Sequence, residues 1–268
     1  MTLVSHRARF IFLKTHKTAS TSVEVALEPL CAPDDAATGA HYRAELVSEA
    51  GVIGARGAAS RNAVWKNHLT AKAVRKLTGR EVWRDYAKIT TVRNPYARMV
   101  SMFHSRQSDE AREALGDAAF GDVRARFRAW LAQRRQSNNL RKLTIGPRYV
   151  IDHVLYFEHL EDEFGELAHA LGLPGEPLPR FKTDRNPRAE PWRDYYDDDA
   201  RRLVEKGSAF ELAFFGYRFA DGARGGPNPP RFARKALRLL ARDPGRATNA
   251  FRRPRKALSP LDGAEPPA

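Results

Sequence analysis

The chain has 268 residues and a formal net charge of +14, and hydrophobic residues make up 42% of it. This is enough for one large α/β domain or two small ones. No apolar run approaches the ~18 residues of a membrane span, so the sequence predicts no transmembrane helix. The single cysteine, Cys31, excludes an internal disulfide and a multi-cysteine metal site. The N-terminus is a poor match to a signal peptide, and we expect a cytoplasmic protein.

The positive charge is unevenly distributed along the chain. Residues 221–268 carry eleven Lys and Arg against four Asp and Glu, whereas residues 1–220 carry 35 against 28. A moderately basic body suits anionic substrates or cofactors, but it suits nucleic acid as well, so charge alone does not distinguish between these partners. We expect one domain over residues 1–220 and a basic, Pro- and Gly-rich extension over residues 221–268.

The first strongly patterned stretch predicts a strand, a polar turn and a helix. Phe10–Leu13 is a short apolar run typical of a buried strand. Residues 14–22, KTHKTASTS, are mainly lysines and small hydroxyl residues. Val23, Ala26 and Leu27 then recur at helical spacing.

Such a turn predicts an anion site. Backbone N–H groups, the positive end of a helix and Lys17 would meet at one point, and hydroxyl donors there favour phosphate. These hydroxyls belong to Thr18, Ser20, Thr21 and Ser22. The turn has no glycine, however, and its lysine precedes the hydroxyl residues, so it matches the P-loop motif of nucleoside triphosphatases poorly.

A second strand–turn–helix unit begins at residue 88. The β-branched run KITTV (88–92) predicts a strand, and Pro95 suits the first turn of a helix. Arg93 would leave the carboxyl end of the strand, where open α/β sheets bind ligands. Arg98 and Ser101 are further polar groups, one and two turns into the helix.

The remaining elements complete the pattern of an α/β protein. Helices are expected over residues 41–50, 70–77, most of 107–135, 161–173 and 197–214, a strand over 150–157, and loops over 51–62 and 136–148. Asn67 or Thr70 would cap the helix at 70–77, and Gly79 would end it. Three strands, each followed by a helix, predict a parallel sheet covered by helices on both faces.

Several of these segments together resemble one family, the sulfotransferases that use 3′-phosphoadenosine 5′-phosphosulfate (PAPS). KTHKTASTS is similar to the loop that binds the 5′-phosphosulfate. TTVRNPYARMVSMF is similar to the 3′-phosphate motif, in which a serine follows an arginine by eight residues. YFEHLEDEF and the run ending in FFGYRF resemble later parts of the family. The likeness spans about residues 9–219 and is greatest for the carbohydrate branch, of heparan 2-O and chondroitin type.

The resemblance implies a three-layer α/β/α fold like that of P-loop NTPases, and transfer of a sulfuryl group from PAPS to a hydroxyl without a metal. Lys17 and residues Thr18, Ala19, Ser20, Thr21 and Ser22 would hold the 5′-phosphosulfate. Arg93 and Ser101 would hold the 3′-phosphate. The implied acceptor is a carbohydrate or a glycolipid.

The resemblance also implies a catalytic base. His68 lies in WKNHLTA, where this branch places a histidine before a helix, and an imidazole suits removal of a hydroxyl proton. His16 and Glu24 are rival candidates. His16 stands where the family often has a proline, which leaves its role open.

Other readings of the chain stay open at this point. A P-loop-type nucleotide kinase and a non-enzymatic basic nucleic-acid-binding module are the alternatives, although we expect no specific nucleic acid as a partner. Residues 230–242 can form an amphipathic helix with basic residues on one side, a pattern that can contact an anionic membrane surface.

Overall fold

The computed structural model of the chain describes residues 2–133, 139–181 and 186–220. The described residues form two compact units. Of the described residues, 2–92 and 141–181 form the first unit, and 93–133, 139–140 and 186–220 form the second. The extension over 221–268, with the helix expected at 230–242, lies outside the described residues.

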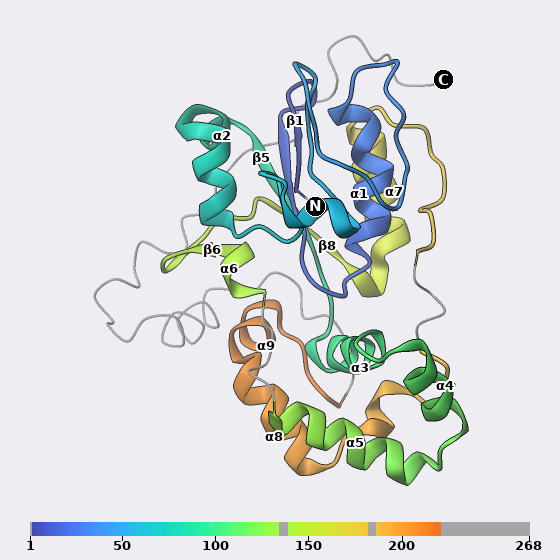
Figure 1. Cartoon of the computed structure of the whole chain (residues 1–268). Coiled ribbons are helices and arrows are strands. Elements are labelled where there is room, and N and C mark those ends of the chain that lie inside the picture. Colours follow the sequence, from blue (N-terminus) through green and yellow to red (C-terminus); the bar gives the residue numbers. More distant parts are fainter. Residues whose placement is uncertain (1, 134–138, 182–185, 221–268) are drawn as a thin grey trace. The chain divides into compact units, whose positions relative to one another are not determined.

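The first unit is organised around a six-stranded sheet with the strand order β3-β4-β1-β2-β5-β8 (Figure 1). Three of its strands are those expected from the sequence: β2 (Phe10–Leu13), β5 (Ala87–Val92) and β8 (His153–Tyr156). These three strands pair in parallel, with Phe12 opposite Ile89 and Thr90 opposite Val154. The prediction of an α/β protein with parallel central strands is therefore confirmed.

The other half of the sheet is antiparallel and was not foreseen. β1 (Thr2–Ser5) pairs with β2 and with β4 (Gly51–Ile53), and β4 pairs with β3 (Leu46–Val47). The helix expected over 41–50 and the loop over 51–62 are thus wrong as assigned. The pairing of β4 with β1 needs glycine at position 51, because a β-carbon there would lie 2.0 Å from the carbonyl oxygen of Val4. In the sequence the same glycine favoured a loop. The strand is also too short to show a period in the sequence.

Helices cover the sheet from both sides. In Figure 1, α1 (Ser20–Leu27) and α7 (Leu160–Ala170) lie on one side of the strands and α2 (Ala71–Asp85) lies on the other. The two helices of the first group share one apolar core with the strands. Its buried side chains include Phe10, Phe12, Val23, Leu27, Ile89, Leu155, Phe164 and Leu167.

α2 starts where the sequence predicted but runs past its expected end. The Thr70 hydroxyl accepts a hydrogen bond from the Ala73 N–H at 3.2 Å and caps the helix. Gly79, with φ +78° and ψ 174°, is non-helical, so the first helical segment ends there as expected and a second segment continues α2 to Asp85. Strand β6 (Thr144–Ile145) packs against α2 and forms a small hairpin with β7 (Arg148–Tyr149), and the short α6 (Leu140–Leu143) precedes this hairpin. The loop expected over 136–148 therefore contains regular structure in its described part.

The second unit is helical. Its helices are α3 (Pro95–Ser105), α4 (Asp109–Asp117), α5 (Phe120–Gln133), α8 (Asp198–Gly207) and α9 (Ala209–Phe215). Their core is aromatic and includes Phe103, Phe127 and Tyr195. The single helix expected over 197–214 is two helices, because Ser208 has non-helical angles (φ −118°, ψ 20°). Among the described residues, every helix is too short or too polar to cross a membrane.

Candidate functional site

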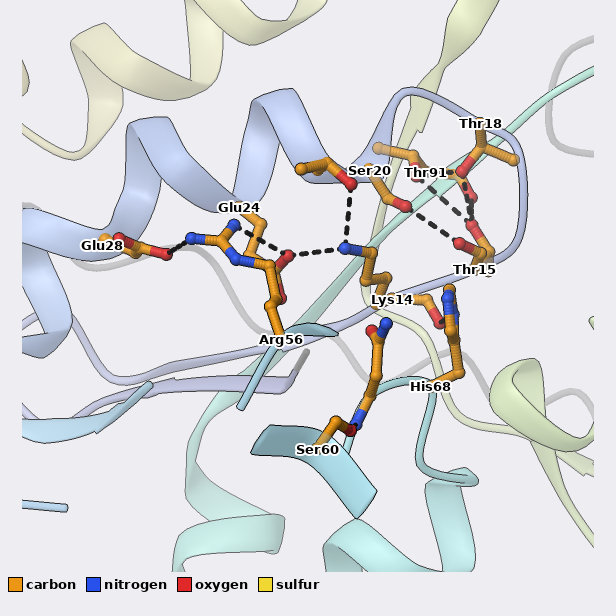
Figure 2. Close-up of polar contacts among 12 residues, drawn as sticks. Lys14, Thr15, Thr18, Ser20, Glu24, Glu28, Arg56, Ser60, His68 and Thr91 are labelled. Atoms are coloured by element: carbon orange, nitrogen blue, oxygen red, sulfur yellow. Dashed lines mark hydrogen bonds and ion pairs between the residues drawn. The ribbon is translucent and has the colours of Figure 1, made fainter. Parts of the chain in front are cut away.

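The polar turn after β2 is anchored by threonines to the neighbouring strand β5 (Figure 2). The Thr15 hydroxyl donates to the carbonyl oxygen of Thr91 at 2.6 Å. The Thr18 hydroxyl lies 2.7 Å from the hydroxyls of both Thr15 and Thr91. All three side chains are fully buried. This network fixes where the turn leaves the sheet.

Two residues of the turn have a left-handed backbone. Lys17 and Ala19 have φ of +58° and +54°, and Thr18 between them does not have a positive φ. Alternation of this kind forms the concave nest that binds anions in proteins. A left-handed conformation costs a residue with a side chain about 1 kcal/mol or more, so the turn has to be held in place by its anchors.

α1 begins at Ser20, three residues before the apolar pattern that predicted it. Its first intrahelical contact is from the Ser22 N–H to the Ala19 carbonyl at 2.9 Å. The N–H groups of Ser20 and Thr21 belong to the first turn, where a helix has no internal acceptors for them. The nest and the helix N-terminus therefore follow each other directly, and both favour an anion.

The hydroxyls of the turn differ in what they do. Those of Thr18 and Ser20 are buried and engaged, the latter with the Thr15 carbonyl at 2.9 Å. Thr21 accepts from the Lys14 ammonium at 2.9 Å, which leaves its own O–H proton for another acceptor. Of these three hydroxyls, Thr21 is thus the one suited to a ligand, while Thr18 and Ser20 would contribute through backbone N–H groups.

Beneath the turn lies a buried ion-pair network that sequence reasoning missed. The Lys14 ammonium is 2.7 Å from a Glu24 carboxylate oxygen, and the same oxygen is 3.4 Å from the Arg56 guanidinium. Arg56 also binds Glu28, which accepts from Arg43 at 3.3 Å. Lys14 was visible as part of the motif, but Arg56 lies in a glycine- and alanine-rich stretch without any signal of burial.

This network removes Glu24 from the candidates for a base. Its side chain is 0% exposed, and one of its carboxylate oxygens pairs with both Lys14 and Arg56. Burial alone would raise the pKa of Glu24, but neighbouring cations, Lys14 among them, hold that pKa below its usual value. A carboxylate so buried and so stabilised as an anion cannot take a proton from a substrate hydroxyl.

His68 lies against the turn, and one of its two ring nitrogens makes a hydrogen bond to the turn's backbone. Its Nδ1 is 3.4 Å from the carbonyl oxygen of Lys14, so Nδ1 carries the proton and Nε2 has the free lone pair. The ring stacks on that of His16, with centroids 3.8 Å apart and planes 27° apart. The backbone of His68 is left-handed, with φ +59°. The structure thus places His16 and His68 side by side, next to the turn that contains Lys17.

The surroundings of His68 keep its imidazole neutral. Burial is the largest cause, and the nearby His16, Lys14 and Lys142 add to it, so that the pKa of His68 lies well below its ordinary value. A neutral imidazole can accept a proton. An anion bound in the adjacent turn would raise this pKa and make His68 a better base.

The residues expected at the 3′-phosphate belong to the second unit. Arg93 directly follows β5, and Asn94 caps α3 by accepting from the Tyr96 N–H at 3.0 Å. Ser101 lies two turns into α3. Arg98, which the sequence offered as a further polar group of this turn, is fully buried and binds Glu211 of α9 at 2.7 Å. Arg98 therefore serves the packing of the helices.

A polar turn that joins the carboxyl end of a parallel strand to the N-terminus of a helix is typical of phosphate- or nucleotide-binding α/β proteins. The family is given by comparison with known proteins: residues 1–218 match the model of the sulfotransferase family. The chain belongs to this family, and its fold is that of the sulfotransferases. Comparison with curated proteins and with solved structures gave no match.

Proposed function

We propose that the protein transfers the sulfuryl group of PAPS to a hydroxyl of a carbohydrate or glycolipid, with His68 as the base. This proposal is supported by two structural features that lie side by side. The nest formed by residues 17–19 runs into the N-terminus of α1, and His68 lies beside it with its proton fixed on Nδ1. Together they supply an anion cradle and a proton acceptor.

The donor set fits a phosphosulfate. Such a group offers several anionic oxygens, and the turn offers Lys17, the backbone N–H groups of residues 18–21 and the Thr21 hydroxyl. When bound, PAPS would supply an activated sulfuryl group and leave as the 3′,5′-bisphosphate. Arg93 and Ser101 are proposed to recognise the 3′-phosphate, which ADP and ATP lack.

His68, Lys17 and the backbone N–H groups then have separate roles in an in-line displacement. His68 Nε2 takes the proton of the acceptor hydroxyl as its oxygen bonds to sulfur. Lys17 and the N–H groups stabilise the negative charge that grows on the leaving phosphate oxygen as its bond to sulfur breaks. The Lys14 carbonyl stabilises the imidazolium that forms, because it already accepts from Nδ1.

Calorimetry without magnesium tests the donor. Adenosine 3′,5′-bisphosphate should bind much more tightly than ADP, and Arg93→Ala should remove that preference. Equal affinity for the two would instead support a nucleotide kinase. Transfer of radiolabelled sulfate from PAPS into polysaccharide and lipid extracts then tests the reaction and its acceptor class, and Lys17→Ala should abolish the transfer.

A further inference from the structure

The segment that carries His68 is an irregular turn between two helices. Residues 62–70 join the short helix η2 (Gly57–Arg61) to α2 and form neither helix nor strand. Trp65 anchors the segment, because it is buried and its carbonyl accepts from the Ala55 N–H at 2.9 Å. Beyond this anchor the chain reaches the left-handed conformation of His68, although no helix or strand holds it there.

Two polar side chains from outside this segment accept its backbone N–H groups. The Glu45 carboxylate, just before β3, accepts from residues 64–65, with its two oxygens 3.1 and 2.7 Å from their nitrogens. The Ser60 hydroxyl accepts from the N–H of Asn67, the residue before His68, at 2.7 Å. Figure 2 shows Ser60 at the short helix that precedes this segment. Carboxylate acceptors make the stronger kind of hydrogen bond to a backbone N–H, so Glu45 and Ser60 together set the path of the chain up to the candidate base.

The ring of His68 depends on this path for its orientation. The hydrogen bond from Nδ1 to the Lys14 carbonyl is 3.4 Å long, which is longer than most N–H···O hydrogen bonds and therefore weak. The contact with the ring of His16 is a stacking contact, which fixes the plane of the ring but not which nitrogen faces Lys14. The position of the ring thus follows from the backbone of His68, and a moderate change in its dihedral angles would carry Nδ1 away from the carbonyl.

We propose that Glu45 and Ser60 are positioning residues, which hold the segment of His68 so that Nδ1 faces the Lys14 carbonyl and Nε2 keeps its lone pair for the acceptor hydroxyl. Their effect on turnover rests on the proposed sulfuryl transfer with His68 as the base, whereas their effect on the ring does not. A misplacement of about 1 Å at a reacting group can lower a rate by about 10²-fold. Loss of either side chain should therefore slow the transfer while cofactor binding is unchanged.

The state of the ring gives the first test, in the ligand-free full chain. Long-range ¹H–¹⁵N NMR spectra report which nitrogen of each histidine carries the proton, and comparison with His68→Asn identifies the signals of His68. The parent chain should show the Nδ1–H form. Ser60→Ala and Glu45→Ala should shift His68 towards the Nε2–H form, because the hydrogen bond to the Lys14 carbonyl is what selects the tautomer. Ser60→Thr keeps a hydroxyl at this position and should keep the parent spectrum.

The rate of transfer from saturating PAPS into the polysaccharide extract gives the second test. Ser60→Ala should lower it about tenfold, with the affinity for adenosine 3′,5′-bisphosphate unchanged, and Ser60→Thr should restore it. The matched control is Ser48→Ala, which removes another half-buried hydroxyl of the first unit, bonded to the Gly51 carbonyl at 3.4 Å, and should leave the rate unchanged. In the His68→Asn background Ser60→Ala should have no further effect, because a residue that acts only through the imidazole loses its influence when the imidazole is absent.

The outcomes separate this proposal from the proposed function. Signals of His68 that are unchanged in Ser60→Ala and Glu45→Ala would overturn the proposal, whether or not the chain transfers sulfate, and Ser60→Ala decides alone if Glu45→Ala does not fold. An equal fall of the rate with and without the imidazole would also overturn it, since the hydroxyl would then act on the fold. A ring that responds as expected, in a chain that transfers nothing from PAPS, would keep the two positioning residues and refute the sulfotransfer.

Discussion

At the scale of single residues, His68 combines a strained backbone with an oriented ring. Its left-handed φ of +59° is unusual for a residue with a side chain. Asparagine tolerates this conformation well and cannot act as a base at neutral pH. His68→Asn therefore isolates the proton acceptor from the fold. We expect turnover to fall by about 10²–10⁴-fold, the range of general base catalysis, while calorimetry shows unchanged affinity for adenosine 3′,5′-bisphosphate. Turnover within a factor of three of the parent would rule His68 out and direct attention to His16.

The ionisation of His68 gives a second prediction, in the pH dependence of the rate. Burial and neighbouring positive charge lower its pKa in the ligand-free protein, so the neutral, proton-accepting form persists well below pH 6.5. The profile of kcat/KM for PAPS, which reports the free enzyme, should show no acid limb near 6.5. The profile of kcat, which reports the enzyme with PAPS bound, should show its acid limb at a higher pH than the profile of kcat/KM, because the bound anion raises the pKa of His68. An acid limb at pH 6.5 in both profiles would contradict this environment.

At the scale of elements, the sequence indicates the strand–turn–helix units but not the side-chain contacts that hold them in place. Phe10–Leu13 and residues 88–92 are recognisable because a buried parallel strand needs a continuous apolar or β-branched run. The use of each hydroxyl is not recognisable, since Thr18 and Thr21 look alike in sequence and differ only in which strand or lysine lies beside them. The strand–turn–helix unit was therefore predictable, and the contacts that each hydroxyl makes inside the turn were not.

The ion pairs under the turn were beyond prediction for a related reason. They join Lys14 and Glu24, at either end of the turn, to Arg56, which only the unforeseen antiparallel strands bring near. Charged residues are rarely buried without partners, so the sequence favours exposed positions for all three. Knowledge of the pairing of β1 with β4 would have been needed to place Arg56.

The network should stabilise the turn, and Glu24→Gln tests this. The substitution leaves the ammonium of Lys14, which is only 5% exposed, without its carboxylate. Breaking a buried pair from one side costs about 3–5 kcal/mol, to be measured by urea unfolding followed by tryptophan fluorescence. The double variant Lys14→Met/Glu24→Gln should recover part of the loss, because no unpaired ammonium remains. Glu81→Gln, at an exposed position of α2, is the control and should change stability by less than about 0.5 kcal/mol. A loss below about 1 kcal/mol for Glu24→Gln would show that water reaches Lys14.

At the scale of the whole molecule, the sequence gives the charge and the family but not the division of the chain. The two segments that resemble phosphate-binding motifs are readable in order, yet Lys17 belongs to the first compact unit, and Arg93 and Ser101 belong to the second. The first unit is also discontinuous, because residues 141–181 return to it after the helices α3–α5. Local patterns report which helices form, whereas the unit that each one joins depends on contacts between distant residues.

The distribution of charge over the molecule leads to a prediction for a chain that ends at residue 220. The truncation removes eleven Lys and Arg and four Asp and Glu, which halves the net charge from +14 to +7. Both apolar cores lie within the residues retained, and the family match ends at residue 218. We therefore expect the melting temperature and the affinity for adenosine 3′,5′-bisphosphate to be unchanged. Binding to duplex DNA should become much weaker and lose most of its salt dependence, since that binding follows the number of cations that meet phosphates. If the truncated chain instead keeps the full salt-dependent binding to DNA and binds no bisphosphate, the body of the protein is a nucleic-acid-binding module and the proposed reaction fails.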